Sequence, residues 1–339
     1  MSFNIIYVLT PYGVSTGGVE LLHQLVDCLR KNALNAFIVY EKDGELIHNP
    51  EVCSEYRSYN VKTCSTIVDS RDNMLILPEI YFSYVSQYSN IYFGCWWLSV
   101  NNRYRACSLM QKLQYASSIK QKFEVVKRYL KKYEKCSPND NRLLKKNDKR
   151  IFHFYQSVYA QCHLYNLGFS KILPLSDYIN CEFWKNNSMD LDRREDVVLY
   201  NPSKGFEITK KIIAFMPEVH FVPIVGYDRT QMIKLFQSSK LYIDFGSFPG
   251  KDRLPRETVL CDCCLITGKD GASFYFEDVA IDDSYKFDLR FINIEDIAQR
   301  IRYVLANYNI CCKDFEFYKA RILREQDVFE REVVTFFKQ

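Results

Sequence analysis

The 339-residue sequence contains no run of about eighteen apolar residues, which is the length that a membrane-spanning helix needs. It has only five histidines, and its 13 cysteines form just one tight cluster, at Cys261, Cys263 and Cys264. That spacing is not typical of zinc sites and no second cysteine pair matches it, so we expect buried thiols and no metal site. The remaining cysteines are scattered and no signal peptide is recognised, so we expect reduced thiols in a cytoplasmic protein.

The composition indicates a folded protein with more than one domain. The apolar fraction of 47% and the charged fraction of 25% are typical of globular proteins, and disorder is not expected for most of the chain. Because the length exceeds the usual size of one hydrophobic core, two domains are the better expectation.

Residues 240–268 are the most informative segment of the chain. They read as a half-buried strand, a loop broken by Gly246, Pro249 and Gly250, a helix and a second strand. In an open parallel sheet, ligands bind beyond the carboxyl ends of the strands, and a helix N-terminus there favours anions. Because this loop and the helix start carry three cations, a phosphorylated ligand fits the segment; the cations are Lys251, Arg253 and Arg256.

The rest of the chain alternates between predicted strands and helices, which indicates an α/β protein with a doubly wound sheet. A polar stretch at 186–195 reads as a linker, and 314–338 reads as one long polar helix. Strands are expected at 4–9, 36–40, 74–77, 91–95, 151–154, 196–200, 220–226 and 240–245. Helices are expected at 206–215, after the strand at 196–200, and at 229–238, after the strand at 220–226.

Two motifs resemble those of the GT-B glycosyltransferases. The run Leu254, Pro255, Arg256 and Glu257 is similar to, and one residue shorter than, the Leu-Pro-x-x-Glu that opens the donor-side helix, and residues 17–20 are similar to a Gly-Gly-x-Glu turn. Residues 244–257 as a whole resemble a group of capsule and lipopolysaccharide biosynthesis proteins. The resemblance implies a GT-B fold of two Rossmann-like domains facing a central cleft: an acceptor-side domain at 1–180, a nucleotide-sugar-binding domain at 195–310, and a C-terminal helix at 311–339 packing back towards the first domain.

The chain departs from that family at one position. Many members, notably retaining ones, carry a second glutamate eight residues before the first, and here that position is Pro249. An inverting reaction would need an Asp, Glu or His as general base and a retaining one would not, so both outcomes stay open.

For the donor side, the resemblance implies binding of a nucleotide sugar as substrate, without a metal or other cofactor. Cations must then stabilise the departing diphosphate, and Lys204 and Arg253 are the catalytic candidates. Glu257 would accept hydrogen bonds from ribose hydroxyls, and residues 268–271 would approach the sugar. The full expected donor-binding set is Lys204, Gly226, Tyr227, Lys251, Arg253, Arg256 and Glu257.

For the acceptor side, the expected cleft residues are Gly17, Gly18, Trp97 and His153. Trp96 and Trp97 are adjacent on a predicted strand, and neighbouring side chains of a strand point to opposite faces. One of the two is therefore a candidate for lining a cleft. The alternative is that it packs inside the domain.

Residues 119–150 differ from the rest of the chain in charge. They hold twelve Lys and Arg residues against four acidic ones, a net charge of +8, although the whole chain carries only +4. Apolar residues recur among them at helical spacing, so the stretch is either a basic amphipathic surface for anionic lipid or a solvated helix. No nucleic-acid-binding module accompanies the charge.

These features predict a glycosyltransferase that moves a sugar from a nucleotide-sugar donor to a surface glycan (capsule, O-antigen or lipooligosaccharide), in the cytoplasm and in peripheral contact with the membrane. Two alternatives stay open: a catalytically inactive GT-B-like scaffold that binds nucleotide sugars or glycans, and another nucleotide-dependent α/β enzyme such as a sugar epimerase.

Overall fold

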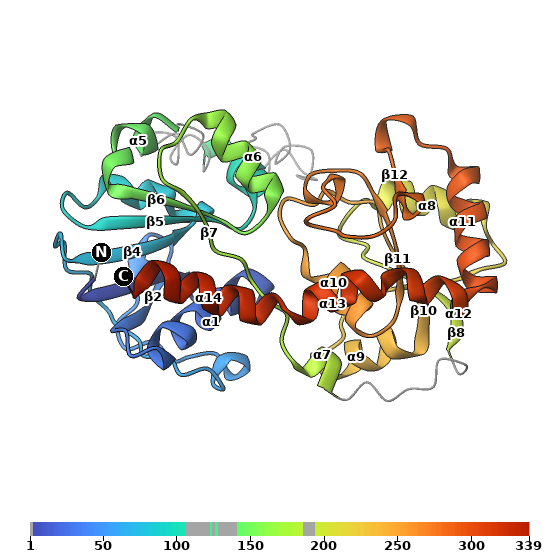
Figure 1. Cartoon of the computed structure of the whole chain (residues 1–339), viewed down its shortest axis with the longest axis horizontal. Helices are drawn as coiled ribbons and strands as arrows, with labels where there is room; N and C mark the ends of the chain where they lie inside the picture. Colours follow the sequence, from blue (N-terminus) through green and yellow to red (C-terminus); the bar gives the residue numbers. More distant parts are fainter. Residues whose placement is uncertain (1–2, 106–122, 124–125, 128–140, 186–193, 339) are drawn as a thin grey trace. The chain divides into compact units, whose positions relative to one another are not determined.

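The computed structural model describes residues 3–105, 123, 126–127, 141–185 and 194–338, and the chain divides into two compact units (Figure 1). Unit 1 consists of residues 1–156, 160–176 and 328–339, and unit 2 of residues 157–159 and 177–327. The chain therefore passes into unit 2 between Ser176 and Asp177 and returns between Asp327 and Val328.

Unit 1 is built on a seven-stranded sheet in the order β3-β2-β1-β4-β5-β6-β7, in which β3 is antiparallel and the other strands are parallel. The buried apolar runs confirm the strands predicted in this half of the chain. The strands are β1 (Ile5–Pro11), β2 (Ala36–Lys42), β3 (Glu45–Leu46), β4 (Asn73–Pro78), β5 (Tyr92–Trp97), β6 (Ile151–Tyr155) and β7 (Ile172–Pro174). Its helices include α1 (Gly17–Lys31), α2 (Val100–Arg105), α5 (Asn141–Lys146), α6 (Val158–Leu167) and most of α14 (Glu325–Phe337).

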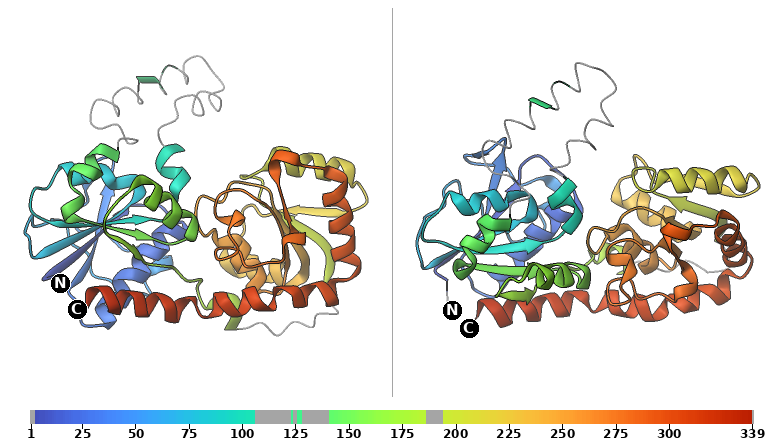
Figure 2. Two further views of the ribbon diagram at one scale, coloured as in Figure 1. Left: turned by 45° about the horizontal axis from the view of Figure 1, so that its top comes forward. Right: turned by 90° about the horizontal axis from the view of Figure 1, so that it is seen from above.

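Helices cover both faces of the unit 1 sheet, and this explains the two adjacent tryptophans. Figure 2 shows helices on both sides of this sheet. The ring of Trp96 stacks on Phe329 of α14, and the ring of Trp97 contacts His163 of α6. Both side chains are fully buried. Alternation along the strand sends them to different faces, but each face has its own core.

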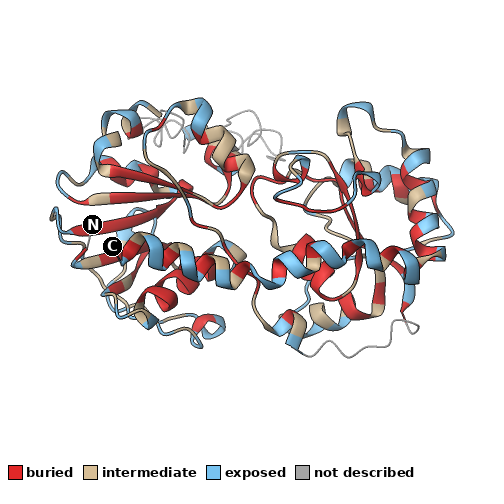
Figure 3. Cartoon of the chain, viewed as in Figure 1, coloured by how far each residue is buried: buried red, intermediate tan, exposed pale blue. Residues whose placement is uncertain are grey.

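Unit 2 is built on a five-stranded parallel sheet in the order β12-β11-β10-β8-β9, and its strands are mostly buried (Figure 3). This confirms the predicted βαβαβ pattern. The strands are β8 (Glu195–Tyr200), β9 (His220–Pro223), β10 (Ser239–Asp244), β11 (Cys264–Gly268) and β12 (Lys286–Phe287); the helices are α7 (Glu182–Lys185), α8 (Phe206–Phe215), α9 (Arg229–Ser238), α10 (Arg253–Leu260), α11 (Ile294–Ala306), α12 (Tyr308–Cys311) and α13 (Glu316–Leu323).

The prediction of one long helix over 314–338 is wrong. The segment forms a short 3-10 turn, then α13, and then α14, with the break at Arg324. The break makes Glu325 the first residue of α14, and its carboxylate contacts a buried arginine described below.

Two loops at the carboxyl edge of the unit 2 sheet pack backbone against backbone. Gly205 follows β8 with φ of +60°, and a Cβ there would lie 2.3 Å from the carbonyl carbon of Phe245, which follows β10. A Cβ at Gly246 would lie 2.5 Å from the Cβ of Lys204. Only glycine fits this contact without a shift of the main chain, so the packing holds Lys204 against the end of β10.

We expect Gly205→Ala to lower the stability of unit 2 by more than the roughly 1 kcal/mol that a left-handed alanine alone costs, because it adds a backbone clash. The matched control is Gly226→Ala, since Gly226 also has a positive φ, of +76°, but a Cβ there would meet nothing within 4 Å. Chemical denaturation of both variants measures the difference. Equal losses of stability would show that the two loops are not packed as described.

Candidate functional site

The strand order of unit 2 places its candidate site at β8 and β10. From β8 the chain moves first to β9 on one side and then to β10 on the other, so β8 and β10 are neighbours at the point where the order reverses. Ligands of open α/β sheets bind at that switch point, outside the carboxyl ends of the two strands. The loop after β8 carries Lys204, and the loop after β10 leads to Lys251, Asp252 and Arg253.

Lys204 and Arg253, the two catalytic candidates, are each bound to a carboxylate and partly accessible. The ammonium of Lys204 donates to the carboxylate of Asp252, and the side chains are 31% and 17% exposed. The Nε of Arg253 donates to Oε1 of Glu257 at 3.3 Å, one helical turn further along α10. Glu257 itself is buried.

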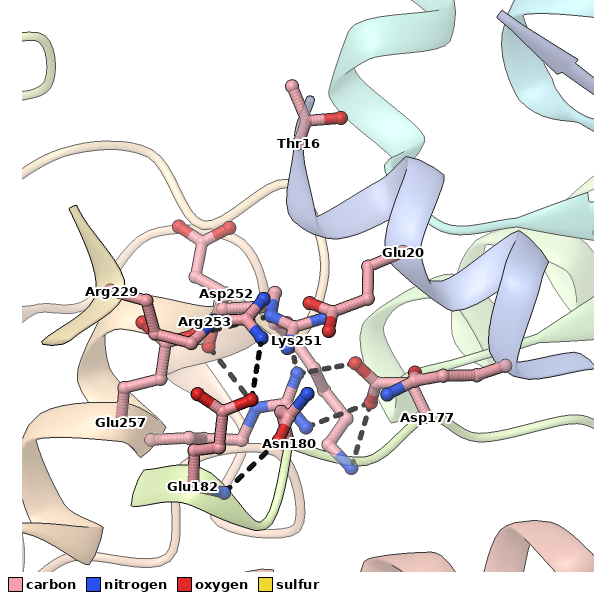
Figure 4. Close-up of polar contacts among 12 residues, drawn as sticks. Thr16, Glu20, Asp177, Asn180, Glu182, Arg229, Lys251, Asp252, Arg253 and Glu257 are labelled. Atoms are coloured by element: carbon pink, nitrogen blue, oxygen red, sulfur yellow. Dashed lines mark hydrogen bonds and ion pairs between the residues drawn. The ribbon is translucent and has the colours of Figure 1, made fainter. Parts of the chain in front are cut away.

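Arg256, one turn into α10, lies at the centre of a buried ion-pair cluster. Its Nη1 donates to Oδ1 of Asp177 at 2.9 Å and to Oε2 of Glu325 at 2.7 Å, and its Nη2 donates to Oδ2 of Asp177 at 2.5 Å. Lys251 contacts the same two acids. Its ammonium lies 3.8 Å from Asp177 (Figure 4) and 2.6 Å from Glu325. Burial alone would raise the pKa of the Asp177 carboxyl, but the charges of Arg256 and Lys251 hold it below its usual range.

This cluster corrects the expected donor contact of Arg256. Arg256 has five N–H donors, and its remaining two donate to the main-chain oxygens of Lys251 and Asp252. The guanidinium is fully buried, with every donor in use, and the Lys251 side chain is nearly buried against Glu325. Arg256 therefore shapes the loop and has no donor left for a ligand, because its acidic and main-chain partners use all five. Lys251 is paired with Glu325 in the same cluster.

Asp244 is the last residue of β10 and interacts electrostatically with Lys204. Its carboxylate accepts hydrogen bonds from the hydroxyl of Tyr242 at 2.8 Å and from the backbone N–H of Gly246 at 2.9 Å. Burial raises the pKa of this carboxyl to about 6, the charge of Lys204 works in the opposite direction, and Asp252 adds to the increase. The site thus contains a carboxyl group that titrates near neutral pH.

The remaining donor-side residues lie in loops at the same edge. Gly226 and Tyr227 follow β9, and Tyr227 is 38% exposed. Residues 269–271 follow β11 and are held to the β10 loop by hydrogen bonds between Phe248 and both Asp270 and Ala272. The structure therefore brings the expected loops to one edge of the sheet, as parallel strands require.

On the acceptor side, Gly17 and Gly18 are the first residues of α1, after the N-cap Thr16, whose hydroxyl accepts from the backbone N–H of Val19. A Cβ at Gly18 would meet no atom within 4 Å. The loop from β1 to α1 lies at the switch point of unit 1, because β1 separates β2 from β4 in the strand order.

Trp97 and His153 belong to the core of unit 1 and do not line a surface cleft, which corrects the expectation for both. The indole Nε1 of Trp97 donates to Nδ1 of His153 at 3.2 Å, and His153 stacks on Phe169. Both are fully buried, and burial lowers the pKa of His153 to about 3. A neutral core histidine of this kind is not placed to act as a general base.

Sequence reasoning missed Glu79, which directly follows β4 at the unit 1 switch point. It is buried, its Oε2 accepts from the backbone N–H of Leu98 at 3.3 Å, and burial raises its pKa to about 7. Pro78 and the end of a buried strand were the available signals. Asp177 and Glu325 were also missed, because nothing local in the sequence pairs them with Arg256.

Three further observations concern metal ions, membranes and the basic stretch. No group of three or more His, Cys, Asp or Glu side chains suited to a metal ion is found among the described residues. No helix within the described ranges has the length and apolarity to cross a bilayer. Most of the basic stretch at 119–150, and most of the expected linker at 186–195, lie outside the described residues.

No protein-family model matches this sequence, and no curated protein matches it significantly.

Solved structures do match, over nearly the whole chain. Sucrose-phosphate synthase from Thermosynechococcus elongatus aligns with a TM-score of 0.59 and 10% identity, covering 99% of this chain and 98% of its own. Anabaena HepE in complex with UDP-glucose aligns with a TM-score of 0.61 and 10% identity, covering 98% and 99%. WaaG, a glycosyltransferase involved in lipopolysaccharide biosynthesis, aligns with a TM-score of 0.56 and 11% identity, covering 97% and 99%. The chain has the α/β fold of the GT-B glycosyltransferases, with two largely parallel sheets.

We expect Arg256→Ala to lower the stability of unit 2 by about 3–5 kcal/mol, because it leaves the buried carboxylates of Asp177 and Glu325 without their main partner. Arg256→Lys should recover only part of the loss, since lysine cannot supply five donors in a plane. Denaturation followed by circular dichroism measures both. The control is Arg302→Ala, whose exposed pair with Glu218 is expected to contribute little. Wild-type stability of Arg256→Ala would contradict the assignment.

We expect Asp244→Asn to stabilise the protein at pH 7.5 and to lose most of this advantage at pH 4. The folded-state pKa of about 6 lies above the usual aspartate value, so the charged carboxylate costs the folded state on the order of 3 kcal/mol above pH 6, and the cost disappears as protonation becomes complete below about pH 4. Thermal unfolding at the two pH values checks this. Asp196→Asn, an exposed position of β8, serves as the control. Destabilisation at pH 7.5 would contradict the prediction.

Proposed function

We propose that this protein is a glycosyltransferase that transfers a sugar from a nucleotide-sugar donor to a glycan acceptor of the cell surface, without a metal ion. The observation that carries the proposal is the pair Lys204 and Arg253. Both are partly accessible cations on loops that meet at the switch point of a parallel sheet, in a chain with the GT-B fold. Their charges would stabilise the departing nucleoside diphosphate.

A structural neighbour supports the nucleotide part of the proposal. Anabaena HepE has been solved with UDP-glucose and with UDP, and it aligns over nearly its whole length with this chain. Gly226, Tyr227 and Glu257 then belong to the proposed donor site, together with residues 268–271. Lys251 and Arg256 stabilise the neighbouring loop through their ion pairs with Glu325 and Asp177. On the acceptor side the proposal keeps Gly17 and Gly18, the first two residues of α1; a Cβ at Gly18 would meet no atom within 4 Å.

The surface-glycan acceptor rests on the resemblance of residues 244–257 to capsule and lipopolysaccharide biosynthesis proteins, and on WaaG as a structural neighbour. An acceptor linked to lipid would place the enzyme at the inner face of the membrane, where the basic stretch at 119–150 would contact anionic headgroups.

One observation favours the alternative of an inactive binding protein. Pro249 stands where many GT-B glycosyltransferases carry a further glutamate eight residues before the one matched by Glu257. Every cation of the β10 loop and the start of α10 is matched by a carboxylate. A scaffold would bind the nucleotide sugar without consuming it.

The test combines binding and turnover with one set of variants. We expect UDP-glucose, or another sugar nucleotide of a panel, to raise the melting temperature of the wild type, and Lys204→Ala and Arg253→Ala each to remove most of the shift. Lys211→Ala and Arg302→Ala, exposed cations of α8 and α11, should leave it unchanged. Release of the nucleoside diphosphate in the presence of a glycan acceptor distinguishes the transferase from the scaffold. Absence of any shift across the panel would refute the donor site.

A further inference from the structure

Asp252 stands at the N-cap of α10 and does not cap it. Its φ of −61° and ψ of 141° suit a capping residue, yet its side chain makes no capping hydrogen bond. The carboxylate instead accepts from the ammonium of Lys204, on the loop after β8. An aspartate at this position ordinarily accepts from the backbone N–H groups of the first helical turn.

The neighbouring helix of the same sheet edge shows the ordinary arrangement. Asp228 is the N-cap of α9, and its carboxylate accepts from the backbone N–H of Gln231 at 2.8 Å. The side chain of Gln231 returns a hydrogen bond to the backbone N–H of Asp228 at 3.0 Å, which completes a capping box. Asp252 differs from Asp228 in that its carboxylate is paired with Lys204.

The described ion pairs at Lys204 and along the start of α10 match each cation with at least one carboxylate. Lys204 faces Asp252 directly and lies above Asp244, while Arg253 is bound to Glu257. The described residues that interact here are four cations and five acids. The cations are Lys204, Lys251, Arg253 and Arg256, and the acids are Asp177, Asp244, Asp252, Glu257 and Glu325. A diphosphate that uses Lys204 must first replace the carboxylate that already occupies its ammonium group.

We propose that Asp252 is an internal competitor of the ligand: its carboxylate holds Lys204 in the free protein, a diphosphate displaces it, and the released side chain turns to cap α10. This inference rests on the proposed donor site and adds a residue that sets its affinity. Both side chains are partly exposed, so the exchange costs little, and the cap gained at α10 offsets part of the loss. The exchange filters out weakly charged anions, because a single negative charge only replaces the one that Asp252 supplies.

The experiment measures binding of UDP and of inorganic pyrophosphate by calorimetry. Asp252→Asn removes the competing charge and keeps a good N-cap, so we expect it to bind both probes roughly three- to tenfold more tightly than the wild type, the range that corresponds to a partly exposed ion pair. Asp252→Ser, which also caps helices without a charge, should give a similar gain and guards against a folding defect of one variant. Asp252→Glu keeps the charge and should show no gain.

Two controls separate this effect from a general change in charge. Asp228→Asn removes a negative charge from the neighbouring helix start, and we expect no tightening of pyrophosphate binding there. Adding Lys204→Ala to Asp252→Asn should abolish the gain, because the two residues act on each other.

The outcomes distinguish the inference from the function that it extends. Tighter binding by Asp252→Asn and Asp252→Ser that requires Lys204 supports the inference. Binding by the wild type that requires Lys204, with no gain in either Asp252 variant or with an equal gain in Asp228→Asn, overturns the inference and leaves the donor site standing. Binding by none of these proteins, or binding that does not depend on Lys204, overturns both.

Discussion

The buried guanidinium of Arg256 is the interaction on which the arrangement of the candidate site depends. Its two acidic partners lie at the ends of the long segment of unit 2. Asp177 is the first residue of that segment, and Glu325 lies two residues before its end at Asp327. A buried charge is tolerated only when its donors are all satisfied, and here all five are. One side chain therefore ties both chain connections of unit 2 to the first turn of α10.

The same contacts determine which cations of the candidate site stay partly accessible to solvent. Arg256 donates to the main chain of Lys251 and Asp252, so the loop before α10 has a defined path. Lys251 pairs with Glu325, which also binds Arg256, and Asp252 pairs with Lys204. Lys204 is in turn held against the end of β10 by the contact between Gly205 and Phe245. The candidate site thus contains two partly accessible cations, Lys204 and Arg253, each bound to a carboxylate.

Regular structure was predictable because it depends on local patterns. Buried strands followed by glycine-containing loops and amphipathic helices mark β8 to β11 in the sequence, and parallel strands necessarily bring their following loops to one edge. The burial of Trp97 and His153 was not predictable in the same way. Alternation along β5 states only that Trp96 and Trp97 face opposite sides; whether each side is covered depends on α6 and on α14, which are remote in sequence from β5.

The sequence by itself determined the α/β class, the position of the strand-to-helix loops and the concentration of cations at 251–256. Only the tertiary structure decided which of those cations stay partly accessible, because electrostatic neutralisation depends on distance in space. Asp177 and Glu325 are about 70 to 80 positions from Arg256 along the chain, yet they lie within hydrogen-bonding distance of it. A cationic motif therefore identifies a candidate anion site, and the acids brought to it by the fold set the charge that a ligand encounters.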